Sequence, residues 1–455
     1  MGLLLLALAC SPPPDADLAP VAPVARLPEP VAAADLDPDP AVLEVDLVAR
    51  EADVSLVSAG LTDLWVWADR SADGASVPGP LLDLGDATRL VLHLENQLLE
   101  ATTLHLHGLR IPADQDGTPS SQLVIWPGES WDYVVDVVDE GLGWYHPHLS
   151  SHRQVERGLY APIRMPGGDP LPVSADRVIV LDDLRLHEDG RFDDEWTADD
   201  LYAGRIGSTL LVNGALAGTG TILAGRRERW RLLNAAAART FRVDLGTDAL
   251  LIAHEGGTLA QPVRAREVVL APGDRLEVLV DTEFGDRHDV TLAPYDRGLG
   301  PEPLESLALF AVVGVGGPDP GPVPARQARP PIVAPDAAMR ELRFQRLTDL
   351  RYAIDGQSWP FDVHLDGVLG DRERWRLINE TDQDVPFHLH GTFVQLESAD
   401  GAPSWEDVVT VPPLGVTDVL VPLDAEGAWM LHTHVLEQAE LGMMGMIHVE
   451  PPTAP

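Results

Sequence analysis

The sequence predicts an all-β protein built from tandem β-sandwich or barrel domains. Short runs of alternating apolar and polar residues, such as 89–94 and 130–138, are separated by Gly, Pro, Asp and Asn. No long segment carries convincing helical periodicity. A length of 455 residues with 45% apolar residues is typical of about three domains, each with its own core.

The composition excludes several classes of function. Acidic residues number 72 against 32 basic ones, which gives a net charge of -40. Such a chain repels nucleic acid and anionic lipid, so we expect neither as a partner. The single cysteine, Cys10, excludes an intramolecular disulfide, a Cys-based zinc site and an iron–sulfur cluster. It also excludes a blue copper site, which needs a thiolate within the folded domains.

The first ten residues resemble a bacterial lipoprotein signal, an apolar run that ends at Cys10. In such signals the cysteine is lipidated and becomes the first residue of the mature protein. The basic residues that usually begin a signal are missing, and a generic signal peptide or a buried cysteine is the alternative. No stretch has the roughly 20 apolar residues of a membrane-spanning helix. We therefore expect export to the cell envelope, in the periplasm or on the outer membrane, with membrane contact only through an acyl chain.

The rest of the chain divides by composition and by a repeat. Residues 11–42 are rich in Pro, Ala and Asp and predict a disordered linker. The motif Arg-Glu-Arg-Trp-Arg-Leu-x-Asn occurs at 227–234 and again, 145 positions later, at 372–379. That spacing favours a tandem of similar sandwiches. The predicted domains are 43–167, 168–316 and 339–452, with a Pro/Gly-rich linker at 317–338.

Eight of the 15 histidines form four His-x-His pairs: His105/His107, His146/His148, His388/His390 and His432/His434. On a strand, residues i and i+2 lie on one face, roughly 6.6 Å apart, so both imidazoles can reach one metal or two adjacent metals. Imidazole suits copper and zinc. One pair is weak evidence, but four pairs suit a cluster of two or three ions. Since two pairs lie in the first predicted domain and two in the third, we expect the site between these domains.

The segments around these pairs carry a specific resemblance. The four segments that contain the pairs are Thr103–Gly108, Trp144–His148, Phe387–Gly391 and His432–His434. Three further segments support the same resemblance: Pro78–Pro80, Trp126–Ser130 and Gly442–Met446. Together they resemble the multicopper oxidases (laccases, bacterial cuprous oxidases and their relatives) from about Leu43 to Val449. The resemblance implies three cupredoxin-like Greek-key domains, about three coppers per chain and dioxygen as the oxidant.

The resemblance also implies roles for single residues. His105 and His388 match the ligands of the type 2 copper. The other six, which match the ligands of the type 3 pair, are His107, His146, His148, His390, His432 and His434. Asp116 matches an acidic proton donor beside the type 2 copper, although alone it reads as a loop aspartate before Gly117.

The chain departs from the family at the type 1 copper. The matching positions are Val385, Thr433, Gln438 and Met443, and three of the four lack a suitable ligand. Thr433 stands where the family has the cysteine that passes electrons to the cluster. A second departure is Ala439, at a position where many members have a glutamate, with Glu437 and Glu440 close to it. We therefore expect a complete oxygen-reducing site without the usual site of electron entry.

Three functions compete. The first is a copper-dependent oxidoreductase that reduces dioxygen with electrons from a small reductant or an electron-donor protein. The second is an envelope protein that binds copper for sequestration or delivery. The third is a non-catalytic structural protein of the cell envelope, because some family relatives act in cell division. The eight retained histidines favour the first.

Overall fold

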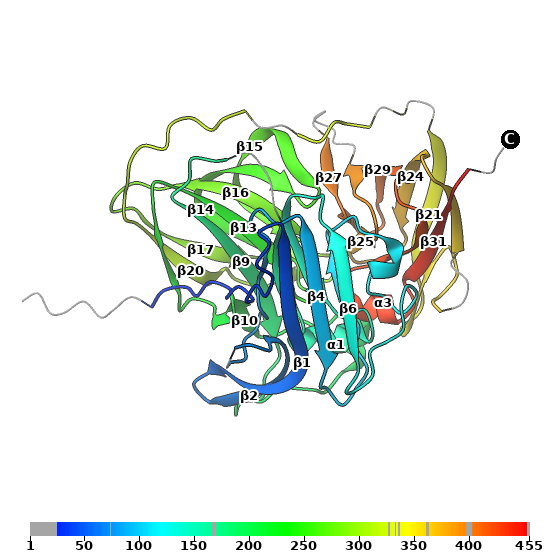
Figure 1. The fold of residues 1–455 in the computed structure, drawn as a ribbon, viewed down its shortest axis with the longest axis horizontal. Helices are drawn as coiled ribbons and strands as arrows, with labels where there is room; N and C mark the ends of the chain where they lie inside the picture. The colour runs from blue at the N-terminus through cyan, green and yellow to red at the C-terminus, as the bar shows by residue number, and fades with distance from the viewer. Residues whose placement is uncertain are drawn as a thin grey trace, which may run out of the picture.

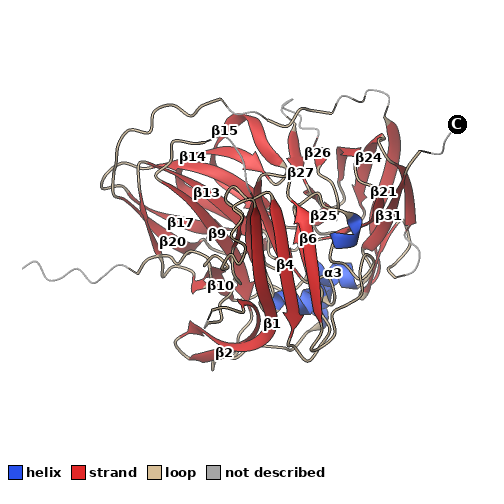
Figure 2. Ribbon diagram, viewed as in Figure 1, coloured by secondary structure: helices blue, strands red, loops and turns tan. Residues whose placement is uncertain are grey.

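The computed structural model describes residues 25–72, 74–165, 170–325, 328–332, 334, 337–360, 364–396 and 403–452. Strands dominate these residues, which confirms the all-β prediction (Figure 2). The helices among them are short: α1 (Ser151–Glu156), α2 (Ala198–Ala203), α3 (Leu436–Glu440) and the 3-10 helix η1 (Ala113–Gln115). None of the helices in the described ranges is long and apolar enough to cross a membrane. Cys10, the predicted lipidation site, lies outside the described residues.

The first strands form two four-stranded sheets, ordered β2-β1-β4-β6 and β3-β8-β7-β5, which we call the first unit. Figure 1 shows β1, β4 and β6 in blue to cyan, side by side. Side chains that include Trp67, Leu92 and Tyr133 form its buried core. The strands are β1 (Val42–Val57), β2 (Gly60–Asp69), β3 (Leu82–Asp83), β4 (Arg89–Asn96), β5 (His105–His107), β6 (Ser130–Asp136), β7 (Gly141–His146) and β8 (Ala161–Met165).

The next strands form the middle unit, green in Figure 1. A ten-stranded sheet follows the order β11-β10-β9-β13-β16-β14-β17-β20-β12, with β15 paired to β14, and β18 pairs with β19. The strands are β9 (Ala175–Leu184), β10 (Thr209–Val212), β11 (Ala215–Leu216), β12 (Thr221–Ala224), β13 (Arg227–Asn234), β14 (Phe241–His254), β15 (Gly257–Leu270), β16 (Arg275–Asp281), β17 (Arg287–Ala293), β18 (Tyr295–Asp296), β19 (Pro301–Glu302) and β20 (Leu307–Gly314).

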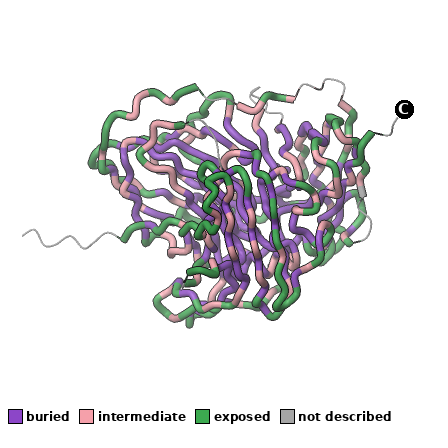
Figure 3. The backbone as a smooth tube through the Cα atoms, in the orientation of Figure 1, coloured by how far each residue is buried: buried purple, intermediate pink, exposed green. Residues whose placement is uncertain are grey.

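The remaining strands form the third unit, with sheets ordered β22-β21-β24-β29-β26-β27 and β23-β31-β30-β25-β28. The strands are β21 (Ala338–Thr348), β22 (Arg351–Ile354), β23 (His364–Val368), β24 (Arg372–Asn379), β25 (Val385–Leu389), β26 (Val394–Leu396), β27 (Ser404–Glu406), β28 (Val408–Val411), β29 (Val416–Pro422), β30 (Gly427–Thr433) and β31 (Met444–Glu450). The interior strands of the molecule carry most of the buried residues (Figure 3).

The repeated motif occupies equivalent strands. β13 lies between a parallel partner, β9, and an antiparallel one, β16, and β24 lies in the same way between β21 and β29. In each copy the tryptophan, Trp230 or Trp375, is fully buried, and its Nε1 donates to the glutamate two residues earlier. β4 of the first unit repeats the pairing, parallel to β1 and antiparallel to β6. This repeated pairing supports a tandem of three similar β-units. The exact residue limits of the domains stay a prediction.

The predicted disordered linker differs from the structure in its second half. Residues 25–41 lie along the surface of two units (Figure 1). The Leu27 amide donates to the Thr221 carbonyl of the middle unit, and the Ala33 amide donates to Leu81 of the first. The Leu27 side chain is buried in the core of the middle unit. The Pro- and Ala-rich composition predicted a solvated chain. The segment is ordered because Leu27 packs into the middle core and because its main chain hydrogen-bonds to Thr221 and Leu81.

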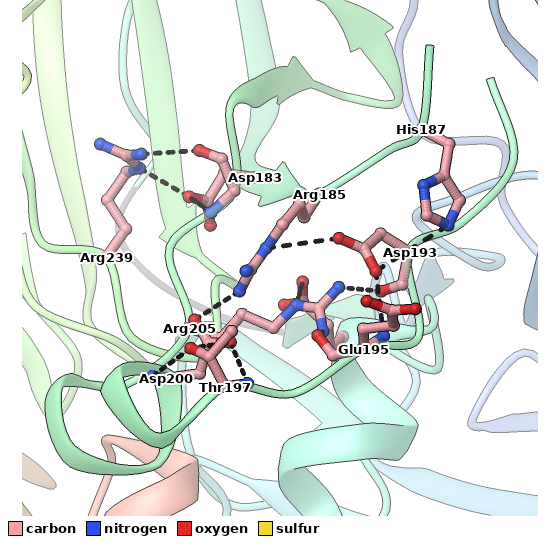
Figure 4. Close-up of polar contacts among 11 residues, drawn as sticks. Asp183, Arg185, His187, Asp193, Glu195, Thr197, Asp200, Arg205 and Arg239 are labelled. Atoms are coloured by element: carbon pink, nitrogen blue, oxygen red, sulfur yellow. Dashed lines mark hydrogen bonds and ion pairs between the residues drawn. The ribbon is translucent and has the colours of Figure 1, made fainter. Parts of the chain in front are cut away.

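A buried polar network joins the first and middle units near α1 and α2. The Arg205 guanidinium is fully buried, and its Nε donates to the Glu156 carboxylate of α1 at 3.0 Å. Its other nitrogens donate to the carbonyls of Asp193 and Glu195, as Figure 4 shows. Nearby, Arg239 pairs with the buried Asp183 at 2.7 Å. A buried charge is stable only when it is paired, so the Arg205–Glu156 contact ties the middle unit to the first, and the Arg239–Asp183 pair stabilises the middle unit itself.

Candidate metal centre

The four histidine pairs meet where the first and third units face each other. His105 and His107 are the ends of β5, and His105 lies opposite His146 of β7. In the third unit, His388 of β25 lies opposite His432 of β30. Antiparallel pairing therefore brings two histidines of each unit into register. The remaining members lie just past these strands: His390 and His434 come directly after β25 and β30, and His148 is the second residue after β7.

The imidazole rings form one compact cluster across the two units. His105 stacks on His390 with centroids 4.1 Å apart, and His107 stacks on His388 at 3.9 Å. The ligand atoms fall into three histidine groups whose members lie within 4.8 Å of one another. These groups are His105/His107/His388, His107/His146/His434 and His148/His390/His432. The arrangement therefore offers three adjacent positions for a metal ion.

Hydrogen bonds leave one lone pair free on most of these rings. The Nδ1 atoms of His105 and His388 donate to the main-chain oxygens of Asp116 and Asp407 at 2.6 and 2.7 Å. Because a carbonyl only accepts, each Nδ1 carries the proton and each Nε2 keeps a lone pair. The Nε2 atoms of both histidines are buried and have no hydrogen-bond partner in the structure. This is the arrangement that orients histidine ligands around a metal.

One contact is unfavourable without a cation. The Nδ1 of His432 donates to the Thr433 carbonyl, and the Nδ1 of His390 donates to the Asp116 carboxylate. Their Nε2 atoms then carry lone pairs, yet they lie 3.1 Å apart. The Nε2 of His148 lies 3.2 Å from that of His432. The facing lone pairs of His390 and His432 repel each other, and a bound cation between them removes the repulsion, so the donor set fits a metal.

Burial keeps the cluster neutral. All eight histidines are buried. Desolvation, reinforced by the neighbouring rings, lowers the pKa values of His107, His388 and His390 well below the usual 6.5. Burial lowers the pKa of His432 to about 4. Neutral imidazole is the form that binds a metal ion, so the cluster is ready to bind at neutral pH.

Asp116 lies beside His105 and His390 at the edge of the cluster. Its side chain is buried, and its Oδ2 accepts from the Nδ1 of His390 at 2.9 Å. Its Oδ1 lies 3.4 Å from the Nδ1 of His105. It follows η1, whose end places the carboxylate between the first and third units. The structure therefore places this aspartate in the site rather than in a solvated loop.

The sequence analysis missed Asp407 and Arg275. Asp407 is buried, its carbonyl accepts from His388, and its Oδ1 lies 3.3 Å from the Nε2 of His107. Arg275, from β16 of the middle unit, donates to both carboxylate oxygens of Asp407 at 2.6 and 2.8 Å. The one available signal was a carboxylate directly before the apolar run 408–411, which predicts a buried charge.

The middle unit also contributes a close backbone approach. Gly273 has a φ of 86°, and a Cβ there would meet the His434 ring at 2.9–3.0 Å. Only glycine accepts this conformation without cost and leaves room for the ring. His434 has no hydrogen-bond partner on either ring nitrogen. The turn before β16 therefore holds this imidazole by packing.

The four positions that match the type 1 copper lie together in the third unit and are all buried. Val385 and Met443 belong to its apolar core. The Gln438 Nε2 donates to the Tyr202 carbonyl at 3.2 Å, and Gln383 and Tyr352 donate to the same oxygen. Thr433 accepts from the Val435 amide through its hydroxyl. Val385 and Met443 therefore contribute to packing. The hydrogen bonds to the Tyr202 carbonyl hold the end of α2 in place.

The two glutamates near Ala439 differ in their partners. Glu437 is fully buried, neither of its carboxylate oxygens has a hydrogen-bond partner in the structure, and burial raises its pKa to about 7. Glu440 accepts from the Ser151 amide of α1 at 2.8 Å, and burial raises its pKa as well. Both therefore favour the protonated form more than an exposed glutamate does.

The comparisons with known proteins agree with this geometry. Residues 72–167, 143–290 and 335–453 match sequence profiles described as multicopper oxidase. The multicopper oxidase mco of Staphylococcus aureus is 28% identical over 399 residues, which is 82% of each chain. The cell division protein FtsP of Proteus mirabilis is 26% identical over 409 residues, 83% of this chain and 84% of its own.

Solved structures give the same picture. A multicopper oxidase from Campylobacter jejuni, described as a metallo-oxidase, superposes with a TM-score of 0.83 at 26% identity. The match covers 94% of this chain and 96% of that one. A multicopper oxidase from Pseudomonas thermotolerans gives 0.78 at 28% identity, over 90% and 99% of the two chains. From its sequence profiles, relatives and fold, the chain belongs to the multicopper oxidase family.

Proposed function

We propose that this protein is a copper-dependent oxidoreductase that reduces dioxygen at a trinuclear copper site and has no type 1 copper. The observation that carries the proposal is the set of eight converging histidines, with buried lone pairs that no protein group satisfies. In this proposal His105 and His388 bind the type 2 copper, and the other six bind the type 3 pair. Copper bound there supplies the one-electron chemistry that dioxygen reduction requires.

The protein's own residues then have separate tasks. The carbonyls of Asp116 and Asp407 hold two imidazoles with their lone pairs turned inward. Asp116 is assigned as the proton donor, because its carboxylate lies between His105 and His390. Burial excludes bulk water, which strengthens every electrostatic interaction in the site.

The absence of a type 1 copper rests on the residues at its position. Val385, Thr433 and Gln438 supply no imidazole and no thiolate, and the only cysteine of the sequence is Cys10. Electrons must therefore enter the cluster by another route. We further propose that the chain is exported to the cell envelope, on the basis of the apolar segment that precedes Cys10.

Copper stoichiometry tests the proposal. Protein loaded anaerobically with cuprous ion and desalted should hold about three coppers per chain by elemental analysis. After reoxidation it should show no intense blue absorption band, because that band needs a copper–thiolate bond. His107→Gln should lower the copper content, since His107 belongs to two of the three groups. The exposed His187→Gln should leave it unchanged. An intense blue band would contradict the missing type 1 site.

A second candidate is a structural, non-catalytic role. The observation in its favour is the FtsP relatives, whose identity to this chain is close to that of the multicopper oxidases. A protein that takes up no copper under the conditions above would support this role over the oxidase.

A further inference from the structure

One face of the paired strands β30 and β31 carries a row of side chains that can bind a soft metal ion. Along β31, His448, Met446 and Met444 alternate with residues that pack in the core of the third unit. On β30, Met430 and His432 alternate with core residues in the same way. Since successive residues of a strand point to opposite faces, these five side chains share the face that is turned away from that core.

Strand pairing arranges the row in successive levels. Met444 lies opposite His432, and Met446 lies opposite Met430. His448 forms the next level along β31. Opposed residues of an antiparallel pair have Cβ atoms roughly 4.5–5.5 Å apart, and successive levels on one strand are roughly 6.6 Å apart. The row therefore leads in short steps from His448 to His432, a predicted type 3 ligand.

The row also leads from the surface into the interior. His448 is half-buried, whereas Met430, Met444 and Met446 are buried. The three methionines form a small cluster of their own, separate from the core of the third unit. The half-buried Trp359 packs against this cluster, which we call the methionine cluster.

The methionine cluster differs in composition from the rest of the interior. The sequence has seven methionines, and three of them lie in this cluster. The four other core clusters of the described residues contain at most one methionine each. A methionine side chain is flexible, and its thioether is a soft ligand that selects Cu(I). The row itself contains no carboxylate, the ligand that harder cations prefer.

From this placement we propose that the methionine cluster binds a cuprous ion and passes it to His432, and so acts as the loading site of the histidine cluster. All eight histidines are buried, so an ion must pass other side chains to reach them. His448 is the first donor of the row on the solvent side. The ion keeps its single charge throughout, because thioether bonds are exchanged for imidazole bonds and no electron moves. The destination of the ion rests on the copper site proposed above, whereas binding to the methionines needs only the thioethers.

Silver(I) binding to the metal-free protein tests the methionine cluster without using copper. Silver(I) is a soft monovalent ion like Cu(I), and it is stable in air. NMR spectroscopy of protein with 13C-labelled methionine methyl groups reports on each thioether separately, and Cys10→Ser removes the only thiol. As silver is added to saturation, we expect the methyl signals of the three clustered methionines to shift. The signals of Met165, in the core of the first unit, and of the exposed Met339 should stay in place.

A double variant tests the transfer to the histidines. Met430→Leu/Met446→Leu nearly conserves the apolar volume and removes two of the three thioethers. It should weaken silver binding to the cluster at least about tenfold, and slow the anaerobic filling of the histidines from a cuprous complex by a similar factor. The final copper content per chain should stay the same. Met165→Leu is the matched control, because it removes a buried thioether from another core and should change neither quantity.

The outcomes separate this proposal from the oxidase. Methyl signals that stay in place at saturating silver, or equal filling rates in the double variant and the wild type, would overturn the loading site and leave the oxidase intact. If the double variant does not fold, Met446→Leu alone decides, because it changes one side chain of the cluster. Shifted methyl signals in a protein whose histidines take up no copper would support ion binding by the methionines and reject the oxidase.

Discussion

At the scale of single residues, the site depends on a buried ion pair that no histidine motif includes. Arg275 and Asp407 are both buried, and they join the middle unit to the third. Asp407 in turn holds His388 and contacts His107. One carboxylate therefore couples the stability of the fold to the orientation of two predicted ligands.

Asp407→Asn should lower the free energy of unfolding by about 3–5 kcal/mol, because it leaves the Arg275 charge buried without its bidentate partner. Urea denaturation of the metal-free protein measures this loss. Asp418→Asn is the matched control, since it removes a partner of the half-exposed Arg376. Solvent screens that surface pair, so its loss should change the free energy of unfolding far less than the loss of Asp407 does. Equal losses in the two variants would show that Arg275 does not depend on Asp407.

The residues of the site differ in how far the sequence could predict them. The histidine pairs were predictable because each is a local sequence pattern, whereas Asp116 was named only because it matches an acidic residue of the resembled family. Asp407, Arg275 and Gly273 were not, because each acts through a contact with a residue of another unit. Their local sequence shows only a buried charge or a turn.

At the scale of elements, the turn before β16 shapes the site from outside the third unit. Gly273→Ala should force the methyl group against the His434 ring and so reduce the bound copper. Gly285→Ala is a close control, because its φ of 89° is similar but no atom lies within 4 Å of the position that a Cβ would occupy there. It should cost about 1 kcal/mol of stability and keep the copper. Elemental analysis of both variants checks this, and equal copper content would contradict the contact.

A second element-scale prediction concerns β9, where Asp182 accepts a hydrogen bond from the Tyr160 hydroxyl at 2.5 Å. Burial, together with the charge of Asp183, raises the pKa of Asp182 from 3.8 to about 8. The folded protein then keeps a proton that the unfolded chain releases near pH 4. The contribution of Asp182 to the free energy of unfolding should therefore fall between about pH 4 and pH 8, by on the order of a few kcal/mol.

Asp182→Asn tests this dependence, because the amide keeps an acceptor for Tyr160 and does not titrate. Urea denaturation at several pH values should give a difference between wild type and variant that changes in favour of the variant as pH rises. A difference that stays constant from pH 4 to pH 8 would show that Asp182 is not protonated in the folded protein.

The elements themselves were largely predictable. The alternating runs identified strands such as β4 and β6, and the repeated motif identified β13 and β24 as equivalent. The sequence did not predict that residues 25–41 pack on two units. The composition of residues 25–41 is that of a linker. Their ordered conformation comes from main-chain pairing with distant residues, Arg26 with Thr221 and Ala32 with Leu81.

At the scale of the whole molecule, the predicted ligands come from two units joined by the buried polar contacts of a third. A metal that binds only this folded arrangement stabilises it by mass action. At free copper a thousand times the Kd, the gain is about 4 kcal/mol. Differential scanning calorimetry should therefore show a higher melting temperature after copper loading, and His434→Gln should reduce the shift. A melting temperature that copper does not change would place any bound copper outside the cluster.

The separation of the histidine pairs also sets an order of events during biosynthesis. The ribosome completes the first pair, His105 and His107, more than 300 residues before it reaches His432 and His434. Each of the three histidine groups contains members from both units. An ion captured by the nascent chain would therefore meet only part of its ligands. Productive metal insertion must wait until synthesis and folding of both units are complete, which makes it a maturation step.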